Sequence, residues 1–216
     1  MNDPANWPSS TIHERLLKIA QGLSPELAAA IAAVGPLDPI PRPDTPFPER
    51  LCRAIVGQQL SVKAAATIWG RLVAQAGEQS LIDHIQQTTP EQLRSCGLSA
   101  AKAKAMGAIA LAAQTGELDG EILGSMTVDE RNRALTALWG VGQWTADMMQ
   151  IFYFGEPDIW PAGDTAVRKT LARLTATRLT AAQAKPQEIA GQFAPYRSDL
   201  ARYLWQSIDA APIVEV

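Results

Sequence analysis

The sequence predicts an all-α fold of two helical lobes, and three observations lead to this prediction. Alanine is abundant and runs of β-branched residues are scarce, so helix-forming residues dominate the 216-residue chain. Helix-start signals recur along the sequence, and no segment alternates apolar and polar residues as a half-buried strand would. The composition, 47% hydrophobic and 19% charged, is typical of a globular protein.

The expected helices follow from their start signals and from the spacing of apolar residues. Ser24 precedes a proline at the first helical position, and Thr89 and Thr127 each begin a capping box with a Gln or Glu three residues later. The ranges expected to be helical are 11–22, 25–34, 47–57, 61–76, 90–95, 99–115, 127–138, 143–154, 164–174, 180–193 and 196–208.

Residues 36–48 contain six prolines and no helical period, which predicts an extended linker between the lobes. Residues 1–46 are therefore expected to form N-terminal helices and the linker, and to pack with the C-terminal lobe. Residues 47–157 form a central helical lobe, and residues 158–216 provide the helices that complete the second lobe.

Composition also bounds the location of the protein. The N-terminus lacks a basic start followed by an apolar run, and no apolar stretch reaches the length of a membrane span. Cys52 and Cys96, the two cysteines, each lie on an apolar helical face, as expected for reduced core residues. We therefore expect a cytoplasmic, bacterial protein that acts at the nucleoid and makes no membrane contact.

The net charge of −3 argues against nucleic acid as a partner, because most nucleic-acid-binding proteins present a basic face. Backbone N–H groups at the start of a helix can nevertheless hold a phosphate without any side-chain charge. The charge balance therefore weighs against a DNA-binding interpretation without excluding it.

The segment 138–147 contains two glycines, Gly140 and Gly142, on either side of Val141. This pattern is typical of a tight turn between two helices. The second helix would begin with the N–H groups of Gly142, Trp144 and Thr145, which form an anion site suited to a DNA phosphate. An ordinary corner between helices has the same glycines, so this segment alone favours the simpler interpretation.

Asp164 follows a loop rich in proline and glycine and precedes another expected helix. For an isolated aspartate at this position, helix capping is the favoured interpretation. The start of a helix also keeps a carboxylate ionised, which is useful where positive charge develops on a sugar.

Together, these segments resemble the helix–hairpin–helix DNA glycosylase superfamily. The pattern L-x-G-V-G-x-W-T-A-D at 138–147 is followed by P-x-x-D-x-x-V-R at 161–168, and in that family the hairpin precedes a Gly/Pro-rich loop and a catalytic aspartate. Residues 53–61 resemble the turn that fills the gap left by an extruded base, and residues 93–103 resemble a second hairpin. The similarity extends over about residues 47–205, most of the chain.

Within this superfamily the chain is most similar to the 3-methyladenine DNA glycosylase II branch, in a short form without an N-terminal β-domain. The resemblance implies an active-site cleft between the lobes and a role in base excision repair of double-stranded DNA that contains alkylated bases. The absence of four cysteines speaks against the endonuclease III and adenine-mismatch branches. Pocket width, which ranks alkylated, etheno and deaminated purines, is not encoded in these patterns.

The resemblance implies a role for each of several residues. Asp164 is the catalytic carboxylate, and Gln59, flanked by Gln58 and Leu60, is the wedge that enters the DNA. A helix-terminal polar residue is the competing interpretation of Gln59. The hairpin residues expected to grip the DNA backbone are Gly140, Val141, Gly142, Gln143 and Thr145. No cofactor is required, although a Na⁺ or K⁺ ion is expected at the carbonyls of Thr136, Leu138 and Val141 when DNA is bound.

Trp144 stands where the bifunctional members of the family carry a lysine that attacks the sugar. Tryptophan cannot form a Schiff base, so the resemblance implies a monofunctional enzyme in which water attacks. An alkylated purine is already cationic and is attracted to an indole face. Trp144 and Trp205 are therefore expected to line the base pocket, with Trp160 as a further wall, whereas Trp69 and Trp139 are expected in the core.

Several alternatives remain open. Asp158 and Asp147 are rival carboxylates, with Asp147 expected to form a surface or local pair. The chain could be a non-catalytic helix–hairpin–helix DNA-binding protein in which Asp164 is only a cap, or an all-α scaffold without a nucleic-acid role. DNA binding needs Lys63, Arg168, Lys169 or similar residues near the hairpin face. In each case we expect a monomer.

Overall fold

The computed structural model describes residues 8–41, 44–176 and 184–209, and within these ranges the all-α prediction is confirmed. Thirteen helices and no strand occur there. Their bounds are α1 Ser9–Gln21, α2 Pro25–Val34, α3 Phe47–Gly57, α4 Val62–Ala76, α5 Leu81–Gln87, α6 Pro90–Ser95, α7 Ala100–Gln114, α8 Gly120–Ser125, α9 Val128–Thr136, α10 Gln143–Phe152, α11 Thr165–Leu174, α12 Ala184–Gly191 and α13 Arg197–Asp209.

The chain divides into two compact units. One combines Met1–Pro41 with Gln150–Val216, and the other is Arg42–Met149. The first boundary follows part of the proline-rich segment, and the second falls inside α10. Both boundaries therefore precede the expected ones, which followed residues 46 and 157. Among the described residues, no helix is long and apolar enough to cross a lipid bilayer.

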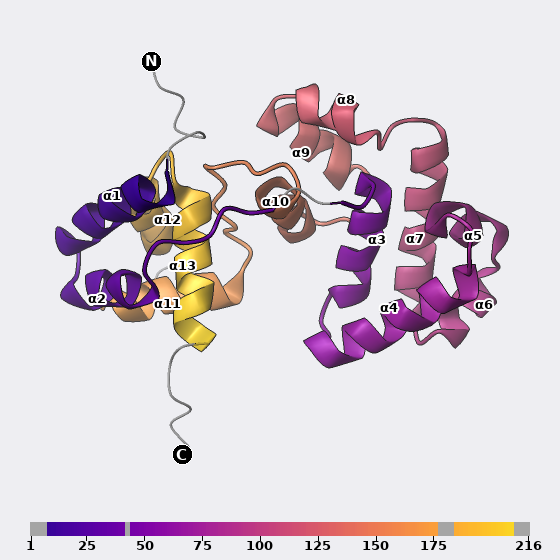
Figure 1. Ribbon diagram of the computed structural model, residues 1–216, viewed down its shortest axis with the longest axis horizontal. Coiled ribbons are helices and arrows are strands. Elements are labelled where there is room, and N and C mark those ends of the chain that lie inside the picture. Colours follow the sequence, from indigo (N-terminus) through magenta and orange to yellow (C-terminus); the bar gives the residue numbers. More distant parts are fainter. Residues whose placement is uncertain (1–7, 42–43, 177–183, 210–216) are drawn as a thin grey trace. The chain divides into compact units, whose positions relative to one another are not determined.

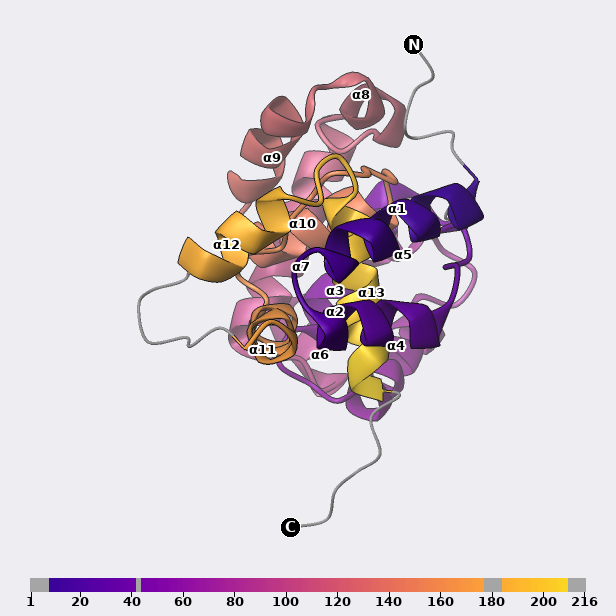
Figure 2. The same ribbon diagram turned by 90° about the vertical axis from the view of Figure 1, so that its left-hand side faces the viewer.

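The unit formed by the two chain ends has α13 packed against α2 and α11, as Figure 2 shows. The apolar face of each helix supplies the core: Leu27 and Ile31 of α2, Val167 and Leu171 of α11 and Leu200 of α13 are buried. This packing fixes the start of α11, where Asp164 lies.

The unit formed by Arg42–Met149 is built around α7, which packs against α3, α5 and α6 (Figure 1). Met106 and Ile109 of α7 are fully buried, as are Leu51 and Ile55 of α3. Cys52 and Cys96 are free and buried in this unit, as predicted. The unit carries both the 57–61 turn and the hairpin before α10.

Most helix starts agree with the sequence signals. Thr89 and Thr127 form complete capping boxes, and the Ser24 hydroxyl caps α2. The helices α5 and α8 were not predicted, and each is shorter than eight residues. Of the helix expected over 180–193, residues 180–183 lie outside the described part, and α12 covers Ala184–Gly191, two residues short of the expected end.

Candidate active site

The hairpin begins where α9 ends and turns at Gly140, whose φ of +87° lies in the left-handed region. The Val141 N–H donates to the Leu138 carbonyl at 3.1 Å and closes the turn. A Cβ at Gly140 would lie 2.6 Å from the Cβ of Ala105 on α7, so glycine is required both for the conformation and for packing. The turn holds the first N–H groups of α10 at one end of the unit, which suits an anion.

Side-chain hydrogen bonds stiffen this hairpin. The Gln143 amide donates to Asn132 Oδ1 at 2.8 Å and accepts from Asn132 Nδ2 at 3.1 Å, which joins α10 to α9. The same Gln143 amide donates to Asp147 Oδ1 at 2.7 Å. The side chain of Gln143 therefore stabilises the hairpin, and the backbone N–H of Gln143 is the group suited to bind a phosphate.

Asp147 is buried within α10 and forms the expected local pair, but it does not lie on the surface. Burial raises the pKa of its carboxyl group from 3.8 to about 6, and the hydrogen bond from Gln143 opposes that rise. Asp147 lies inside a helix and binds a side chain of the hairpin, whereas Asp164 lies at a helix start, so Asp147 is the weaker rival for catalysis.

The 57–61 turn presents Gln59 and Leu60 to solvent, and Gln59 has a φ of +56°. Gln58 points elsewhere, because its amide donates to Thr145 Oγ1 at 3.0 Å and to the Gly140 carbonyl at 3.4 Å. Leu60 and the strongly exposed Val62 border an open groove of about 250 Å³. In this turn the Gln58 side chain is therefore bonded to the hairpin, whereas Gln59 and the apolar Leu60 form an exposed tip.

Lys102, in the first turn of α7, binds the backbone of the 57–61 turn and of the end of α3. Its ammonium donates to the carbonyl of Val56 at 2.8 Å and to that of Gln58 at 2.7 Å. Desolvation lowers the pKa of Lys102. The carbonyls belong to the C-terminal end of α3, where a positive charge is favourable.

Two tryptophans of the hairpin region reach solvent. Trp144, at the start of α10, has 39% of its surface exposed. Trp139, expected in the core, is 45% exposed, so that expectation was wrong. It precedes Gly140 at the hairpin tip, and the ammonium of Lys104 lies 4.3 Å from its ring centroid, which covers the ring in place of a core.

Asp164 is buried at the N-terminus of α11 and caps it, since its Oδ1 accepts the Val167 N–H at 2.9 Å. The Asp164 N–H donates to the Pro161 carbonyl at 2.8 Å, which fixes the turn that leads into the helix. This capping bond is the contact that the helix-cap interpretation predicted, on the carboxylate to which the resemblance assigns catalysis.

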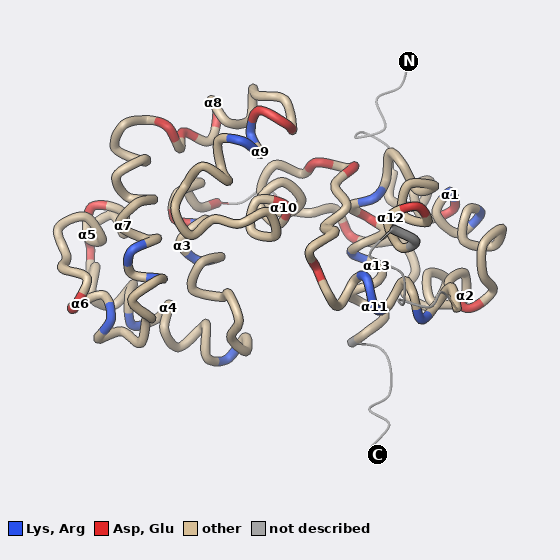
Figure 3. The backbone as a smooth tube through the Cα atoms, turned by 180° about the vertical axis from the view of Figure 1, so that it is seen from behind, with Lys and Arg blue, Asp and Glu red and all other residues tan. Residues whose placement is uncertain are grey.

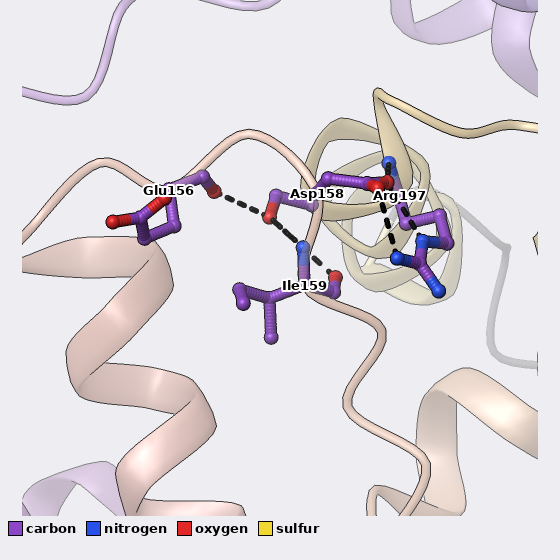
Figure 4. A network of polar contacts seen from close by, with 5 residues as sticks. Glu156, Asp158, Ile159 and Arg197 are labelled. Carbon is purple, nitrogen blue, oxygen red and sulfur yellow. Dashed lines mark hydrogen bonds and ion pairs between the residues drawn. The ribbon is translucent and has the colours of Figure 1, made fainter. Parts of the chain in front are cut away.

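The loop before Asp164 is attached to the start of α13 (Figure 4). Arg197 donates to both oxygens of Asp158, at 2.7 and 2.8 Å. The Ser198 hydroxyl accepts the Ile159 N–H at 2.9 Å and donates to the Glu156 carbonyl at 2.6 Å. The bidentate pair with Arg197 therefore anchors the loop at Asp158. Asp164 lies farther along the loop, where α11 begins.

Of the remaining tryptophans, Trp205 and Trp160 lie in the same unit as Asp164, whereas Trp69 belongs to the hairpin unit. Trp205 is half-buried, with its ring 5.7 Å from that of Phe152. Trp160 is buried in the core of this unit, and its Nε1 has no hydrogen-bond partner among the described residues. Trp69 is half-buried, with the Arg53 guanidinium 5.9 Å from its ring centroid.

Basic residues of the hairpin unit occur on α4 and α7, as Figure 3 shows. Lys63 is exposed at the start of α4, close in sequence to the 57–61 turn, and Lys104 is exposed beside Trp139. Arg168 and Lys169 belong to α11 in the other unit. The described hairpin unit therefore has cations at both of its candidate contact segments.

Sequence reasoning missed the residues that hold the site in place. Asn132, Lys102 and Ser198 bind the hairpin, the 57–61 turn and the Asp164 loop, respectively. The partners of Lys102 and Ser198 are about forty residues away in sequence, so no local pattern marks them. The position of Lys102 within the resembling segment 93–103 was the available signal.

Comparisons with known proteins agree on one family. A family model described as HhH-GPD superfamily base excision DNA repair protein matches residues 52–194. DNA-3-methyladenine glycosylase 1 of Schizosaccharomyces pombe is 33% identical over 168 residues, which cover 74% of this chain and 71% of the relative.

Two solved structures are similar. Mag1, a 3-methyladenine DNA glycosylase of Schizosaccharomyces pombe in complex with abasic DNA, has a TM-score of 0.75 and 26% identity, covering 89% of this chain and 95% of that one. DNA-3-methyladenine glycosidase of Bacillus halodurans has a TM-score of 0.74 and 26% identity, covering 94% and 90%.

Proposed function

Since the chain belongs to the HhH-GPD superfamily of base excision DNA repair proteins, we propose that it is a monofunctional DNA glycosylase for alkylated purines. Bases of the 3-methyladenine and 7-methylguanine type are the proposed substrates. The observation that carries the proposal is Asp164, a buried carboxylate at the start of α11 whose neighbour Asp158 is already engaged by Arg197.

The proposed reaction is hydrolysis of the N-glycosidic bond. The bond between C1′ and the purine nitrogen breaks, and its electron pair cancels the positive charge of the alkylated base, which leaves neutral. Asp164 stabilises the cationic sugar electrostatically. A water oxygen then bonds to C1′ and loses one proton. The base leaves without being protonated by the enzyme, so no second catalytic acid is needed.

Trp144 supports the monofunctional assignment because an indole has no amine with which to attack the sugar. Its ring is partly exposed, and the attraction of an indole face for a cationic purine is worth roughly 1–2 kcal/mol when desolvated. Trp205 and Trp160 are proposed as further walls of the base pocket.

Double-stranded DNA is the proposed partner, bound by two segments of one unit. The N–H groups of the hairpin and α10 start hold a phosphate, which a net-negative chain can do without side-chain charge. Gln59 and Leu60 enter the space vacated by the flipped base, and their exposure at the tip of a turn supports this role.

A Na⁺ or K⁺ ion is proposed at the hairpin when DNA is bound, with the carbonyls of Thr136, Leu138 and Val141 as its protein ligands. The Leu138 carbonyl accepts the Val141 N–H and retains a second lone pair, so the turn geometry fits such a ligand. The ion would add positive charge opposite a phosphate. We further propose a monomeric enzyme that acts in the cytoplasm.

Base release from methylated DNA, resolved by chromatography, tests this function. Asp164→Asn keeps an N-cap and should leave DNA affinity within a few fold, because asparagine caps about as well as aspartate. Loss of the charge should slow base release by about 10²–10³-fold. Lys18→Met, which removes the charge of an exposed lysine on α1, is the control. Release by the Asn variant at the wild-type rate would leave Asp164 as a cap only.

A further inference from the structure

Gln59 has a backbone conformation that L-residues other than asparagine and aspartate rarely adopt. Its φ of +56° lies in the left-handed region, which glycine adopts freely and which is unfavourable for other residues. The turn is also the exposed end of α3, since Gln59 and Leu60 both face solvent. Surrounding contacts must therefore hold position 59 in this conformation.

The contacts that do so come from Lys102. Its ammonium binds the carbonyls of Val56 and Gln58, and the second of these belongs to the peptide that joins Gln58 to Gln59. Because that peptide plane sets the orientation of Gln59, the hydrogen bond to its oxygen fixes one side of the strained residue. Lys102 is half-buried, and the two hydrogen bonds to carbonyls offset the desolvation that lowers the pKa of its ammonium.

A second restraint links the same turn to the hairpin. The Gln58 amide reaches Thr145 Oγ1 and the Gly140 carbonyl, and Thr145 is buried in the first turn of α10. Residue 58 is therefore held through its carbonyl by α7 and through its side chain by the hairpin. The side chain of Gln59, the next residue, makes no hydrogen bond to any described part of the chain and is exposed beside this fixed residue.

We infer that Lys102 is a positioning residue that presets the 57–61 turn, so that Gln59 is oriented for insertion before DNA arrives. The inference rests on the proposed function, because it assigns Lys102 to the wedge of that reaction. A residue that presets the wedge lowers the ordering required during insertion, and its loss reduces insertion more than binding to undamaged DNA.

The alternative role for a lysine here is direct phosphate contact, and the two roles differ in their readouts. A phosphate ligand would lower affinity for every duplex, damaged or not. A positioning residue leaves affinity for undamaged duplex unchanged and acts only through Gln59. A double-mutant cycle between positions 102 and 59 therefore separates the two roles.

The experiment compares wild type, Lys102→Met, Lys102→Arg, Gln59→Ala and the double variant Lys102→Met/Gln59→Ala. Three quantities are measured: single-turnover base release from methylated DNA, affinity for undamaged duplex, and the fluorescence of 2-aminopurine placed opposite a tetrahydrofuran abasic analogue. Lys18→Met is the matched control for the loss of a lysine charge. Circular dichroism and thermal unfolding verify that each variant is folded.

Lys102→Met is expected to slow base release about tenfold and to diminish the 2-aminopurine signal, with affinity for undamaged duplex unchanged within about twofold. Arginine, which can reach both carbonyls, should restore most of the rate. In the Gln59→Ala background, removal of Lys102 should have no further effect, since the residue through which it acts has been truncated.

Three outcomes would overturn the inference: a wild-type rate for Lys102→Met, multiplicative losses in the double variant, or an equal loss of affinity for undamaged duplex. A wild-type rate for Gln59→Ala would overturn both this inference and the wedge assignment. If wild type released no methylated base, the proposed function would fail, whereas the 2-aminopurine signal on abasic duplex would still test the role of Lys102.

Discussion

Two aspartates six positions apart in one loop have different tasks. Asp158 accepts two hydrogen bonds from Arg197 and holds the loop to α13, whereas Asp164 lies at the start of α11. The two have the same residue type and the same loop, and two features of the sequence favoured Asp164: its position before a helix and the P-x-x-D-x-x-V-R pattern of the resemblance. Arg197 lies 39 residues from Asp158 along the chain, so this pair could not be predicted from a local pattern.

A prediction at the residue scale concerns Trp144. Replacing it with alanine should slow release of cationic 7-methylguanine by about 5–30-fold, the equivalent of roughly 1–2 kcal/mol of cation–π attraction. Release of neutral hypoxanthine should change less, because a neutral base gains little from the indole quadrupole. Parallel single-turnover assays on the two bases measure the difference. Equal slowing of both would show that the indole supplies shape alone.

The expectation for Trp139 failed for a reason that belongs to this scale. Apolar residue type favours burial, but the hairpin tip at Gly140 places residue 139 where no core is available. Lys104, on a different helix, then covers the ring. A tryptophan at a turn is therefore poorly predicted from hydrophobicity alone.

At the scale of elements, the hairpin depends on the glycine that packs on α7. Gly140→Ala adds a Cβ 2.6 Å from that of Ala105 and forces a non-glycine residue to a φ of +87°. We expect a loss of about 2–4 kcal/mol in unfolding free energy, measured by urea denaturation, together with weaker DNA binding. Gly142→Ala is the control, because a Cβ there meets nothing within 4 Å and φ is not in the left-handed region. Equal stability of the two variants would contradict the packing argument.

Asp147 makes the stability of the hairpin unit pH-dependent. The unfolded chain releases this proton near pH 3.8, whereas the folded protein keeps it to about 6, so the folded state is favoured most at low pH. The contribution is lost as the pH rises from about 4 to about 6. Asp147→Asn, which still accepts from Gln143, should have a Tm that exceeds the wild-type Tm increasingly over that interval, with a constant difference at higher pH.

Thermal melts between pH 4 and 8 measure this difference. The exposed Asp44→Asn serves as the control for general charge effects. A difference that narrowed as pH rose would show that the Asp147 carboxylate is stabilised in the fold rather than destabilised.

The capping boxes at Thr89 and Thr127 predicted their helices because a cap is a local signal within four residues. The helix α8 was missed because its sequence, GEILGS, contains two glycines and gives little intrinsic preference for a helix. The buried Arg131 stabilises it by donating to the carbonyls of Leu123 and Met126 at its C-terminal end. That stabilisation depends on tertiary contacts, which a search for start signals does not detect.

At the scale of the whole molecule, the net charge of −3 has a measurable consequence for DNA binding. If neutral backbone groups hold the phosphate, few counterions are displaced, and the slope of log K against log salt should be smaller in magnitude than about 4. Affinity should then fall by less than about 250-fold between 50 and 200 mM salt. Fluorescence anisotropy with an undamaged duplex measures the slope. A slope near −10 would indicate an extensive lysine and arginine contact surface.

The boundaries between the two units are the part of the fold that the sequence predicted least accurately. The proline-rich segment suggested the first boundary, but the second falls within α10 and has no compositional mark. A helix that continues through a boundary gives the same apolar spacing on both sides. Composition therefore cannot locate the point where its contacts change from one unit to the other.

The left-handed conformation of Gln59 has a consequence for the evolution of this chain. Glycine would adopt that backbone geometry without strain, so we expect a Gln59→Gly protein to unfold at a higher temperature while it loses the side chain proposed to enter DNA. Selection for thermal stability alone would therefore favour a less active repair enzyme. Position 59 is where stability and activity make opposite demands on a single residue.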